Sequence, residues 1–189
     1  MSHLLVAGTD TGVGKTVLAA ALVLALRERG VRALGFKPVE TGLEPGVSPD
    51  SQLLAEASGE RLAVARPFLQ LAEPLAPAVA AGRAGVDLPL GQVAERVRDL
   101  QAAGFRLVVE GAGGLLVPLG RGWNAADLAR ACGLRTVLVA RAGLGTLNHV
   151  LLTVEALASR GLPLAGVVLN GAGEPPDLAE ATNPEALGH

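Results

Sequence analysis

The sequence predicts a doubly wound α/β domain, in which helices flank a mainly parallel sheet. Three observations predict it: short apolar runs recur along the chain, the runs are continuous rather than alternating, and segments with a helical pattern lie between them. Continuous apolar runs are typical of strands that are buried on both faces of a parallel sheet. The alternation of strand and helix is the pattern of a doubly wound domain.

Five strands and five helices are expected. The expected strands are His3–Ala7, Ala33–Phe36, Arg106–Val109, Thr136–Ala140 and Leu164–Leu169. The expected helices are Thr16–Arg29, Ser51–Ser58, Leu90–Ala102, Ala125–Ala131 and Leu147–Ser159. Glycines such as Gly30 and Gly133 stand where helices should end, and Asn124 stands where one should begin.

A chain of 189 residues without an internal repeat or a domain linker predicts a single domain over residues 1–189. Residues 62–87 mix prolines with alanines, which predicts an irregular excursion with a short helical turn at Ala78–Ala81. The alternating pattern ends at Gly171, and residues 171–189 are therefore expected to form an irregular surface tail.

Composition excludes several classes of function. Half of the 189 residues are hydrophobic and 18% are charged, which excludes a globally disordered chain. A formal net charge of −2 argues against binding nucleic acid or an anionic membrane through bulk charge. The one cysteine, Cys132, excludes an intrachain disulfide. With neither a signal-peptide pattern nor a membrane-length apolar stretch, we expect a cytoplasmic protein.

Lysine is rare in this chain. Of the 16 basic residues, only Lys15 and Lys37 are lysines, and the others are arginines. A compact ammonium differs from a planar guanidinium in shape and hydration, so each lysine calls for a reason in its own neighbourhood.

A glycine-rich segment follows the first expected strand and leads into a helix. It reads Gly8-Thr-Asp-Thr-Gly-Val-Gly-Lys-Thr16, which is typical of a P-loop although five residues, not four, separate Gly8 from the Gly-Lys pair. Backbone N–H groups of such a loop point at phosphate oxygens, and the helix N-terminus adds its positive end. Lys15 is placed to reach the β- and γ-phosphates, and the Thr16 hydroxyl to bind Mg²⁺. A glycine-rich turn without a ligand is the alternative.

An acidic residue ends another buried strand. Leu107-Val-Val-Glu-Gly-Ala-Gly-Gly114 places Glu110 after an apolar run and before glycines that would let a nucleotide approach the backbone. A carboxylate is expensive to bury without a metal or a hydrogen-bond donor, so Glu110 is a candidate metal ligand. The alternative is a strand-end acid that faces solvent.

With Lys37 in Gly35-Phe-Lys-Pro-Val-Glu-Thr-Gly42 added, the chain resembles the ATP-dependent dethiobiotin synthetase family, which has a P-loop NTPase fold. The resembling segments are Gly8–Thr16, Gly35–Gly42, Asp50, Glu110–Gly114, Leu144–His149 and Val167–Asn170. They occur in family order across most of the chain, and the long spacing in the P-loop is the family's own form.

The resemblance implies a reaction in biotin synthesis. The diamine 7,8-diaminononanoate, CO₂ and MgATP would give dethiobiotin, ADP and phosphate. One amine would capture CO₂ as a carbamate, ATP would convert the carbamate to a carbamic-phosphoric anhydride, and the second amine would close a cyclic urea by expelling phosphate. This chemistry passes negative charge among oxygens, so cations must surround the reacting point.

The resemblance also implies site residues. The nucleotide would contact Gly12, Val13, Gly14, Lys15, Thr16, Val17, Asp50, Glu110, Gly111, Ala112, Gly113 and Asn170. Mg²⁺ would be held by Thr16, Asp50 and Glu110, and the catalytic residues would be Lys15 and Lys37. The substrate would contact Thr11, Lys37, Thr41, Leu144, Gly145, Thr146, Leu147 and Asn148. In the family the carboxylate of the diamine binds a helix N-terminus of the neighbouring subunit, which implies a homodimer with a shared active site.

Several of these residues also have simpler interpretations. Lys37 precedes Pro38 and has the alternative of a strand-end surface lysine. The alternative for Asp50 is the N-cap of the helix expected at Ser51–Ser58, and that for Asn148 is an ordinary helix-start residue. Family members usually continue beyond the Asn170 strand with a loop that cups the adenine, so an open adenine pocket is expected here.

Three other functions compete with the synthetase. A P-loop switch ATPase of the partitioning type, which binds a protein partner, carries a second lysine five residues before the loop lysine, where this chain has Asp10. A cobyrinate-type amidotransferase needs a fused glutaminase domain with a nucleophilic cysteine, for which there is no room. The third is a degenerate nucleotide-binding module.

Overall fold

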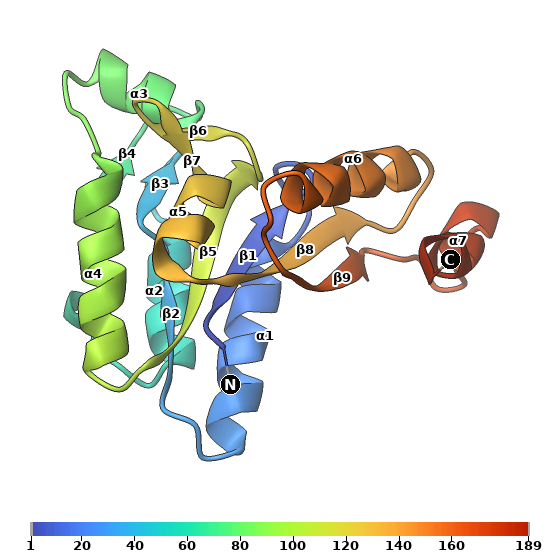
Figure 1. The fold of residues 1–189 in the computed structure, drawn as a ribbon, viewed down its shortest axis with the longest axis horizontal. Helices are drawn as coiled ribbons and strands as arrows, with labels where there is room; N and C mark the ends of the chain where they lie inside the picture. The colour runs from blue at the N-terminus through green and yellow to red at the C-terminus, as the bar shows by residue number, and fades with distance from the viewer. Residues whose placement is uncertain (1, 189) are drawn as a thin grey trace.

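The computed structural model describes residues 2–188, which are layered around one central sheet (Figure 1). The sheet has five strands in the order β2-β5-β1-β8-β9. Their bounds are β1 Leu4–Gly8, β2 Ala33–Phe36, β5 Arg106–Gly114, β8 Arg135–Arg141 and β9 Leu164–Asn170. All neighbouring strands run parallel, which confirms the predicted sheet. The chain leaves β1 toward β2 on one side of the sheet and leaves β5 toward β8 on the other side. The carboxyl ends of the neighbouring strands β1 and β5 therefore form the crevice in which such folds bind ligands.

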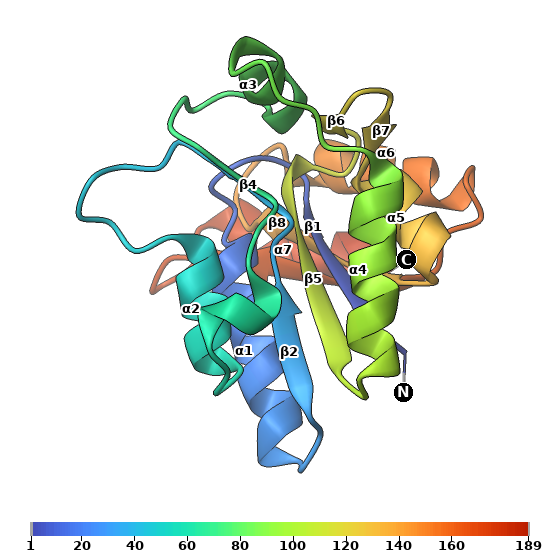
Figure 2. The same ribbon diagram turned by 90° about the vertical axis from the view of Figure 1, so that its left-hand side faces the viewer.

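Helices cover both faces of this sheet, which confirms the doubly wound arrangement. Figure 2 shows α1 (Lys15–Glu28) and α2 (Asp50–Ala57) on one side and α4 (Leu90–Ala102) and α5 (Ala125–Cys132) on the other. The fifth large helix, α6 (Thr146–Ala158), packs on β8 and contributes Leu157 to the core that α4 and α5 share. Each expected helix is therefore present, with ends within a few residues of the expected ones.

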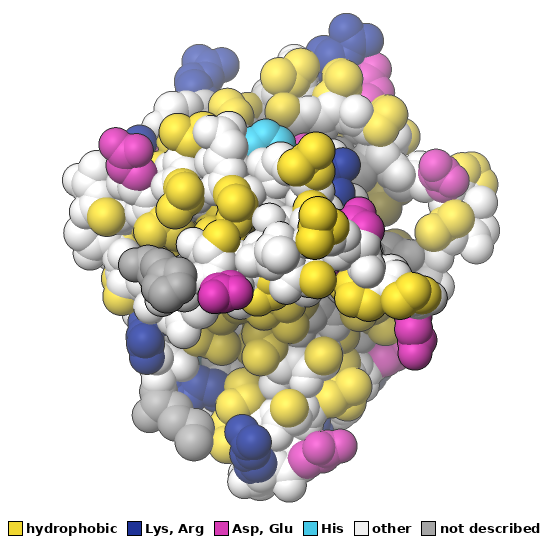
Figure 3. Space-filling model, turned by 90° about the vertical axis from the view of Figure 1, so that its right-hand side faces the viewer, with side chains coloured by type: hydrophobic (Ala, Val, Ile, Leu, Met, Phe, Trp, Pro, Cys, Tyr) yellow, Lys and Arg dark blue, Asp and Glu magenta, His cyan; other side chains and the backbone are white. Residues whose placement is uncertain are grey.

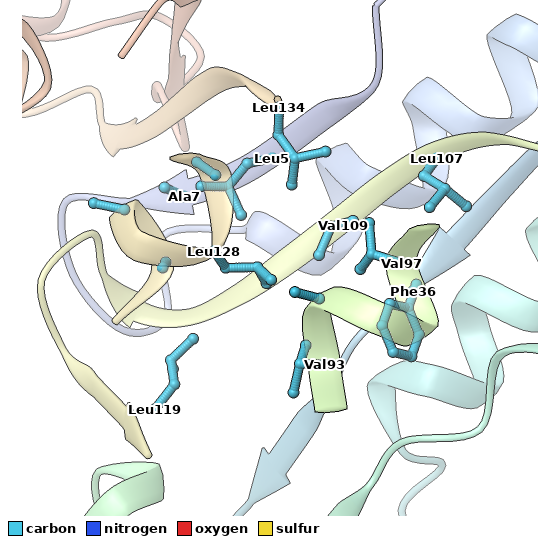
Figure 4. Close-up of a cluster of buried hydrophobic side chains, with 14 of the residues drawn as sticks. Leu5, Ala7, Phe36, Val93, Val97, Leu107, Val109, Leu119, Leu128 and Leu134 are labelled. Carbon is cyan, nitrogen blue, oxygen red and sulfur yellow. The ribbon is translucent and has the colours of Figure 1, made fainter. Parts of the chain in front are cut away.

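The side chains of β1 divide between two apolar cores. Leu5 and Ala7 belong to the larger core, where Leu128 of α5 and Val97 of α4 lie over the sheet (Figure 4). Val6 points to the opposite face and packs in the smaller core with α1 and α2. Because β1 is buried on both faces, its sequence is apolar at every position instead of alternating.

Two small sheets lie near the carboxyl ends of β2 and β5. β3 (Val39–Thr41) pairs in parallel with β4 (Leu69–Leu71), and β6 (Pro118–Gly120) pairs with β7 (Trp123–Asn124). The excursion expected over residues 62–87 holds β4, a 3₁₀ turn η1 (Leu62–Ala65) and α3 (Pro77–Arg83), which is longer than the short turn expected. Pairing between β3 and β4 joins residues about 30 positions apart, so local sequence patterns did not predict it.

The tail expected to be irregular over residues 171–189 contains a helix in its described part, α7 (Leu178–Gly188). Asp177 accepts a hydrogen bond from the Glu180 N–H (2.8 Å), and Glu180 accepts one from the Asp177 N–H (2.9 Å). This reciprocal pair is a capping box, which satisfies backbone donors at a helix start. The spacing Asp-x-x-Glu was readable in the sequence. The helix was missed because the expected tail was inferred from the end of the strand–helix alternation after β9.

Helix α5 begins with a second capping box, and the contribution of this box to the stability of the protein can be measured. The Asn124 side chain accepts hydrogen bonds from the N–H groups of Ala126 (2.9 Å) and Asp127 (3.3 Å), and Asp127 accepts one from the Asn124 N–H (3.0 Å). We expect Asn124→Ala to lower the free energy of unfolding by about 1 kcal/mol, measured by urea denaturation. Asn124→Asp keeps the acceptor and should lie near the parent chain; equal losses in both variants would contradict the capping role.

Candidate active site

The loop between β1 and α1 leads directly into the N-terminus of α1. Gly12 and Gly14 adopt positive φ angles of 69° and 96°, and Gly14 is the residue that precedes the first helical residue, Lys15. These conformations are open to glycine at little cost. They turn the loop around the open N–H groups of α1, as the P-loop prediction requires.

Gly14 is constrained by its neighbour as well as by its backbone. A Cβ atom on Gly14 would collide with the Asn170 side chain of β9, whose amide donates a hydrogen bond to the Val13 carbonyl (2.9 Å). Asn170 therefore fastens the loop to the end of β9.

Substitution of Gly14 tests this close approach. We expect Gly14→Ala to weaken ATP binding by at least about tenfold, because the loop must shift away from Asn170 and strained backbone of this kind costs about 1–3 kcal/mol. Fluorescent-nucleotide titration measures the effect. Gly30→Ala provides a control, since Gly30 also has positive φ, but among residues 2–188 no atom outside its immediate neighbours lies within 4 Å of its Cβ position. Equal losses of nucleotide affinity in the two variants would contradict the steric explanation.

Lys15 lies in the bend of the loop. Its Nζ donates a hydrogen bond to the Asp10 carbonyl (2.9 Å), and its side chain is largely buried. Burial lowers the pKa of Lys15, and the negative charge of Glu110 opposes this shift. The ammonium is thus a partly desolvated cation held close to the helix N-terminus, where a phosphate group would provide stronger acceptors than one carbonyl.

Lys37 forms the centre of a charged cluster. Its Nζ pairs with the Asp50 carboxylate and donates to Glu110 Oε1 at 2.8 Å. Burial would lower the pKa of Lys37, but the charges of Glu110 and Asp50 outweigh burial and raise it. Lys37 is buried, so its interpretation as a strand-end surface lysine is wrong. Pro38 turns the chain from β2 toward β3 and leaves the ammonium between these two acids.

Glu110 is the most deeply buried acid of the cluster, with 1% of its surface exposed. Its Oε1 also accepts a hydrogen bond from the Thr16 hydroxyl (2.9 Å), whereas its buried Oε2 has no hydrogen-bond partner among the described residues. Burial raises the pKa of Glu110, against the opposing charge of Lys37. This position excludes the alternative of an acid that faces solvent.

The oxygens in this cluster fit a divalent cation. Glu110 Oε2 is an unpartnered buried carboxylate oxygen, and the Thr16 hydroxyl and the half-exposed Asp50 carboxylate lie around the same Lys37–Glu110 pair. Within residues 2–188, no group of three or more His, Cys, Asp or Glu side chains could hold a metal by itself. Such a set suits Mg²⁺, which commonly uses one or two carboxylates together with substrate phosphates.

One cavity of about 490 Å³ collects most of the predicted nucleotide and metal residues. Its lining includes Thr11, Gly12, Gly14, Lys15, Thr16, Val17, Lys37, Thr41, Asp50, Glu110, Ala112 and Gly113. Gly111, which was also predicted to contact the nucleotide, does not line this cavity; its Cβ position points toward Ala125 in the interior. The cavity lies at the carboxyl ends of β1, β2 and β5, where a doubly wound sheet binds ligands.

A second cavity of about 500 Å³ lies on the other side of the loop. Leu144, Gly145 and Thr146 line it together with Val13 and Asn170, and Leu147 and Asn148 line neither of these two cavities. The structure therefore does not bring the predicted carboxylate-binding segment beside Lys37 and Thr41 within one chain. The Thr146 hydroxyl is buried at the start of α6 and has no hydrogen-bond partner in the part of the chain that the structure describes.

Comparisons with known proteins agree with this geometry. A family model described as an AAA domain matches residues 2–189. The ATP-dependent dethiobiotin synthetase BioD of Anaeromyxobacter dehalogenans (strain 2CP-C) is 53% identical, over 97% of this chain and 82% of the relative. The chain belongs to the ATP-dependent dethiobiotin synthetase family. The proteins of the same name from Rhodococcus jostii (strain RHA1) and Mycobacterium avium (strain 104) are 47% and 46% identical, each over 99% of this chain and 81% and 82% of their own lengths.

Solved structures support the fold alone. The kinase domain of the Escherichia coli tyrosine kinase ETK superposes with a TM-score of 0.56 at 19% identity, over 90% of this chain and 67% of that domain. The BceF tyrosine kinase domain gives the same TM-score at 18% identity, over 90% of this chain and 69% of that domain. The α/β fold of this dethiobiotin synthetase family member is thus shared with proteins of other activities.

Sequence reasoning missed three charged residues around the site of this dethiobiotin synthetase family member. Asp10 accepts a hydrogen bond from the Thr11 N–H (2.7 Å) and pairs with Arg141 at the end of β8 (3.2 Å). Glu40 is buried one residue before Thr41. Asp10 lies in the Gly8–Thr16 segment and Glu40 in the Gly35–Gly42 segment, and both segments carried the family resemblance. Their positions in these segments could therefore have identified them as candidates. No local pattern could have identified Arg141, because its partner Asp10 is 131 residues away in the sequence.

Proposed function

We propose that this protein catalyses the ATP- and Mg²⁺-dependent ring-closing carboxylation of 7,8-diaminononanoate with CO₂, which forms dethiobiotin, ADP and phosphate in biotin synthesis. The observation that carries the proposal is the convergence of Lys15, Lys37, Thr16 and Glu110 on one cavity at the N-terminus of α1. The reaction needs cations at the point where phosphate and carbamate oxygens meet. The identity to named dethiobiotin synthetases selects this reaction among the many that P-loop folds support.

The loop and the two lysines have separate roles in this proposal. The N–H groups from Gly12 to Val17 bind the triphosphate, and Lys15 exchanges the Asp10 carbonyl for oxygens of the transferred phosphoryl group. Lys37, which lines the same cavity as Lys15, neutralises charge on the carbamate and the phosphoryl group. Ala112, Gly113 and the Asn170 amide complete the nucleotide site.

The carboxylates hold the metal ion in this proposal. Thr16, Asp50 and Glu110 bind Mg²⁺, which would supply further neutralisation of the phosphate charge. The Lys37 ammonium pairs with both Asp50 and Glu110. Phosphate oxygens in the cavity would offer this ammonium other partners, which would leave the two carboxylates available to the cation.

The diamine occupies the part of the cavity lined by Thr11, Val39 and Thr41. Its carboxylate is received by the Leu144–Asn148 segment of a second protomer, so the active form is a homodimer with a shared site. Support for this comes from the separation of that segment from Lys37 within one chain, and from the 94% exposure of Leu144. Leu151 and Leu152 of α6 are also more than half exposed beside it. The buried Thr146 hydroxyl and the N-terminus of α6 favour an anion there.

A shared site makes subunit complementation possible. Lys37→Gln and Thr146→Trp protomers should each lack activity alone and regain it when mixed and refolded together, because the mixed dimer has one intact site. Failure of every mixture to regain activity would contradict a site built from two protomers.

The substrates CO₂ and ATP also fit the proposed cytoplasmic location, with neither nucleic acid nor membrane as a partner. Across residues 2–188, no helix combines the length and apolarity required to span a bilayer.

Release of ADP tests the proposed function against the switch-protein alternative. A synthetase should release ADP only when the diamine and bicarbonate are both present, and chelation of Mg²⁺ should stop the release. ADP release that is independent of the diamine would favour a P-loop switch ATPase. Asp10 opposes that alternative, because this position holds an acid paired with Arg141 instead of a second lysine.

A further inference from the structure

Glu40 is a buried acid that the proposed reaction does not use. It is the middle residue of β3, between Val39 and Thr41, which both line the nucleotide and substrate cavity. Successive side chains of a strand point to opposite sides, so Glu40 points away from the cavity. Only 3% of its surface is exposed. A carboxylate is costly to bury unless donors satisfy it, so the surroundings of Glu40 call for an explanation.

Three donors from two other elements satisfy the Glu40 carboxylate. Its Oε1 accepts a hydrogen bond from the Ser51 N–H (2.6 Å), and its Oε2 accepts from the Ser51 hydroxyl (2.9 Å) and the Gln70 amide (2.8 Å). Ser51 is the second residue of α2, and Gln70 is the middle residue of β4. The carboxylate therefore ties β3 to β4 and to the start of α2, through charge-assisted hydrogen bonds that are stronger than neutral ones.

The start of α2 has no cap of its own. The residue before the helix is Pro49, which makes no side-chain capping hydrogen bond. The first N–H groups of a helix lack partners within the helix, and a negative charge near them is favourable. Glu40 supplies both the acceptor and the charge from a strand, in place of the local cap that Pro49 cannot provide.

We propose that Glu40 is a positioning residue that sets the place of the Asp50 carboxylate in the metal site. Asp50 is the first residue of α2 and immediately precedes Ser51, so the anchor on Ser51 fixes the backbone from which the Asp50 side chain extends. The Asp50 side chain is half exposed, and within residues 2–188 its side-chain partner is Lys37. The proposal rests on the proposed function, because it gives Asp50 the role of a ligand to the cation that accompanies the nucleotide.

Binding of Mn²⁺ in the presence of ADP, measured by the loss of free Mn²⁺ signal in electron paramagnetic resonance, tests this role without any turnover. Outer groups that hold metal ligands typically change metal affinity about 10–100-fold. We therefore expect Glu40→Leu to weaken Mn²⁺ binding to the ADP complex by about 10–100-fold. Affinity for ADP without metal should change by less than about threefold, since the hydrogen-bond partners of Glu40 are Ser51 and Gln70, which lie outside the P-loop.

Ser58→Ala is the matched control for loosening of α2. Ser58 is fully buried just beyond the other end of this helix, where its hydroxyl accepts from the Gly35 N–H (2.9 Å) and donates to the Leu54 carbonyl (2.6 Å). Its loss should lower the midpoint of thermal unfolding but leave Mn²⁺ affinity unchanged. If Ser58→Ala weakens Mn²⁺ binding as much as Glu40→Leu does, or if Glu40→Leu leaves Mn²⁺ binding unchanged, the positioning role is overturned.

A pair of conservative changes keeps the test decisive if Glu40→Leu fails to fold. Gln70→Glu replaces the donor to Glu40 with a second carboxylate, and repulsion between the two charges should displace Glu40 from Ser51. This variant should therefore weaken Mn²⁺ binding. The double variant Glu40→Gln with Gln70→Glu restores one donor and one acceptor between these positions and should recover Mn²⁺ affinity to within about threefold. Absence of recovery in a folded double variant would overturn the proposal. Dethiobiotin formation by the parent chain is scored separately, so its failure would contradict the proposed function without changing the Mn²⁺ result.

Discussion

Lys37→Gln is expected to lower the rate of dethiobiotin formation by about 10³-fold, the upper end of the effect of removing one preorganised donor from a developing oxyanion. ATP affinity should stay within a few-fold of the parent value, because the P-loop and Lys15 remain. The reason is the position of the Lys37 ammonium, which lies between Asp50 and Glu110 at the cavity and is held charged there. Single-turnover measurement of ring closure, with nucleotide binding measured separately, checks this expectation.

Lys37→Arg serves as the control for charge alone. Arginine keeps the positive charge but presents a wider planar group, so it should restore little of the activity. Equal losses of nucleotide binding and ring closure in Lys37→Gln would contradict the role given to this residue, since they would indicate general damage to the cavity.

Glu110→Gln is expected to raise the concentration of Mg²⁺ required for half-maximal activity by more than about 100-fold, beyond the effect typical of outer residues around a metal. The substitution replaces one carboxylate oxygen with an amide NH2 group and removes the negative charge beside Thr16 and Lys37. Titration of activity with Mg²⁺ measures the shift. Glu56→Gln, a change on the exposed surface of α2, is the control for net charge.

The stability of the Glu110→Gln variant gives a second readout. Removal of one partner from a buried ion pair leaves the other poorly compensated and is destabilising by about 3–5 kcal/mol. Because Asp50 still pairs with Lys37, we expect a loss toward the lower end of that range in urea unfolding. An unchanged Mg²⁺ requirement in a folded Glu110→Gln variant would contradict the proposed metal site.

The central sheet and its large helices were predictable because their signals are local. Continuous apolar runs marked the strands on both sides of β1, and the Gly-Val-Gly-Lys-Thr run marked the turn into α1. Lys15 begins α1 and Lys37 directly follows β2, as expected. The expectation that Glu110 follows the end of its strand was wrong, because β5 continues past Val109 to Gly114 and Glu110 lies within it. The parallel order of β1, β2 and β5 brings the three residues to one cavity. The rarity of lysine also indicated functional roles for Lys15 and Lys37, and both side chains line the cavity.

The parts that were not predicted depend on contacts between distant positions. The pairing of β3 with β4, the Asp10–Arg141 ion pair and the anchor from Glu40 to Ser51 join segments whose local patterns contain no sign of one another. α7 is a different case, because its Asp177–Glu180 capping pair is local and was readable. The placement of Leu144–Thr146 in a separate cavity also required the structure.

The most direct test of the proposed function is the fixation of isotopically labelled bicarbonate into an acid-stable product. Carbamates lose CO₂ in acid, whereas the cyclic urea of dethiobiotin retains the label. We predict label in a product with the mass of dethiobiotin only when ATP, Mg²⁺ and 7,8-diaminononanoate are present together. ATP turnover with no acid-stable label under these conditions would contradict the proposed reaction.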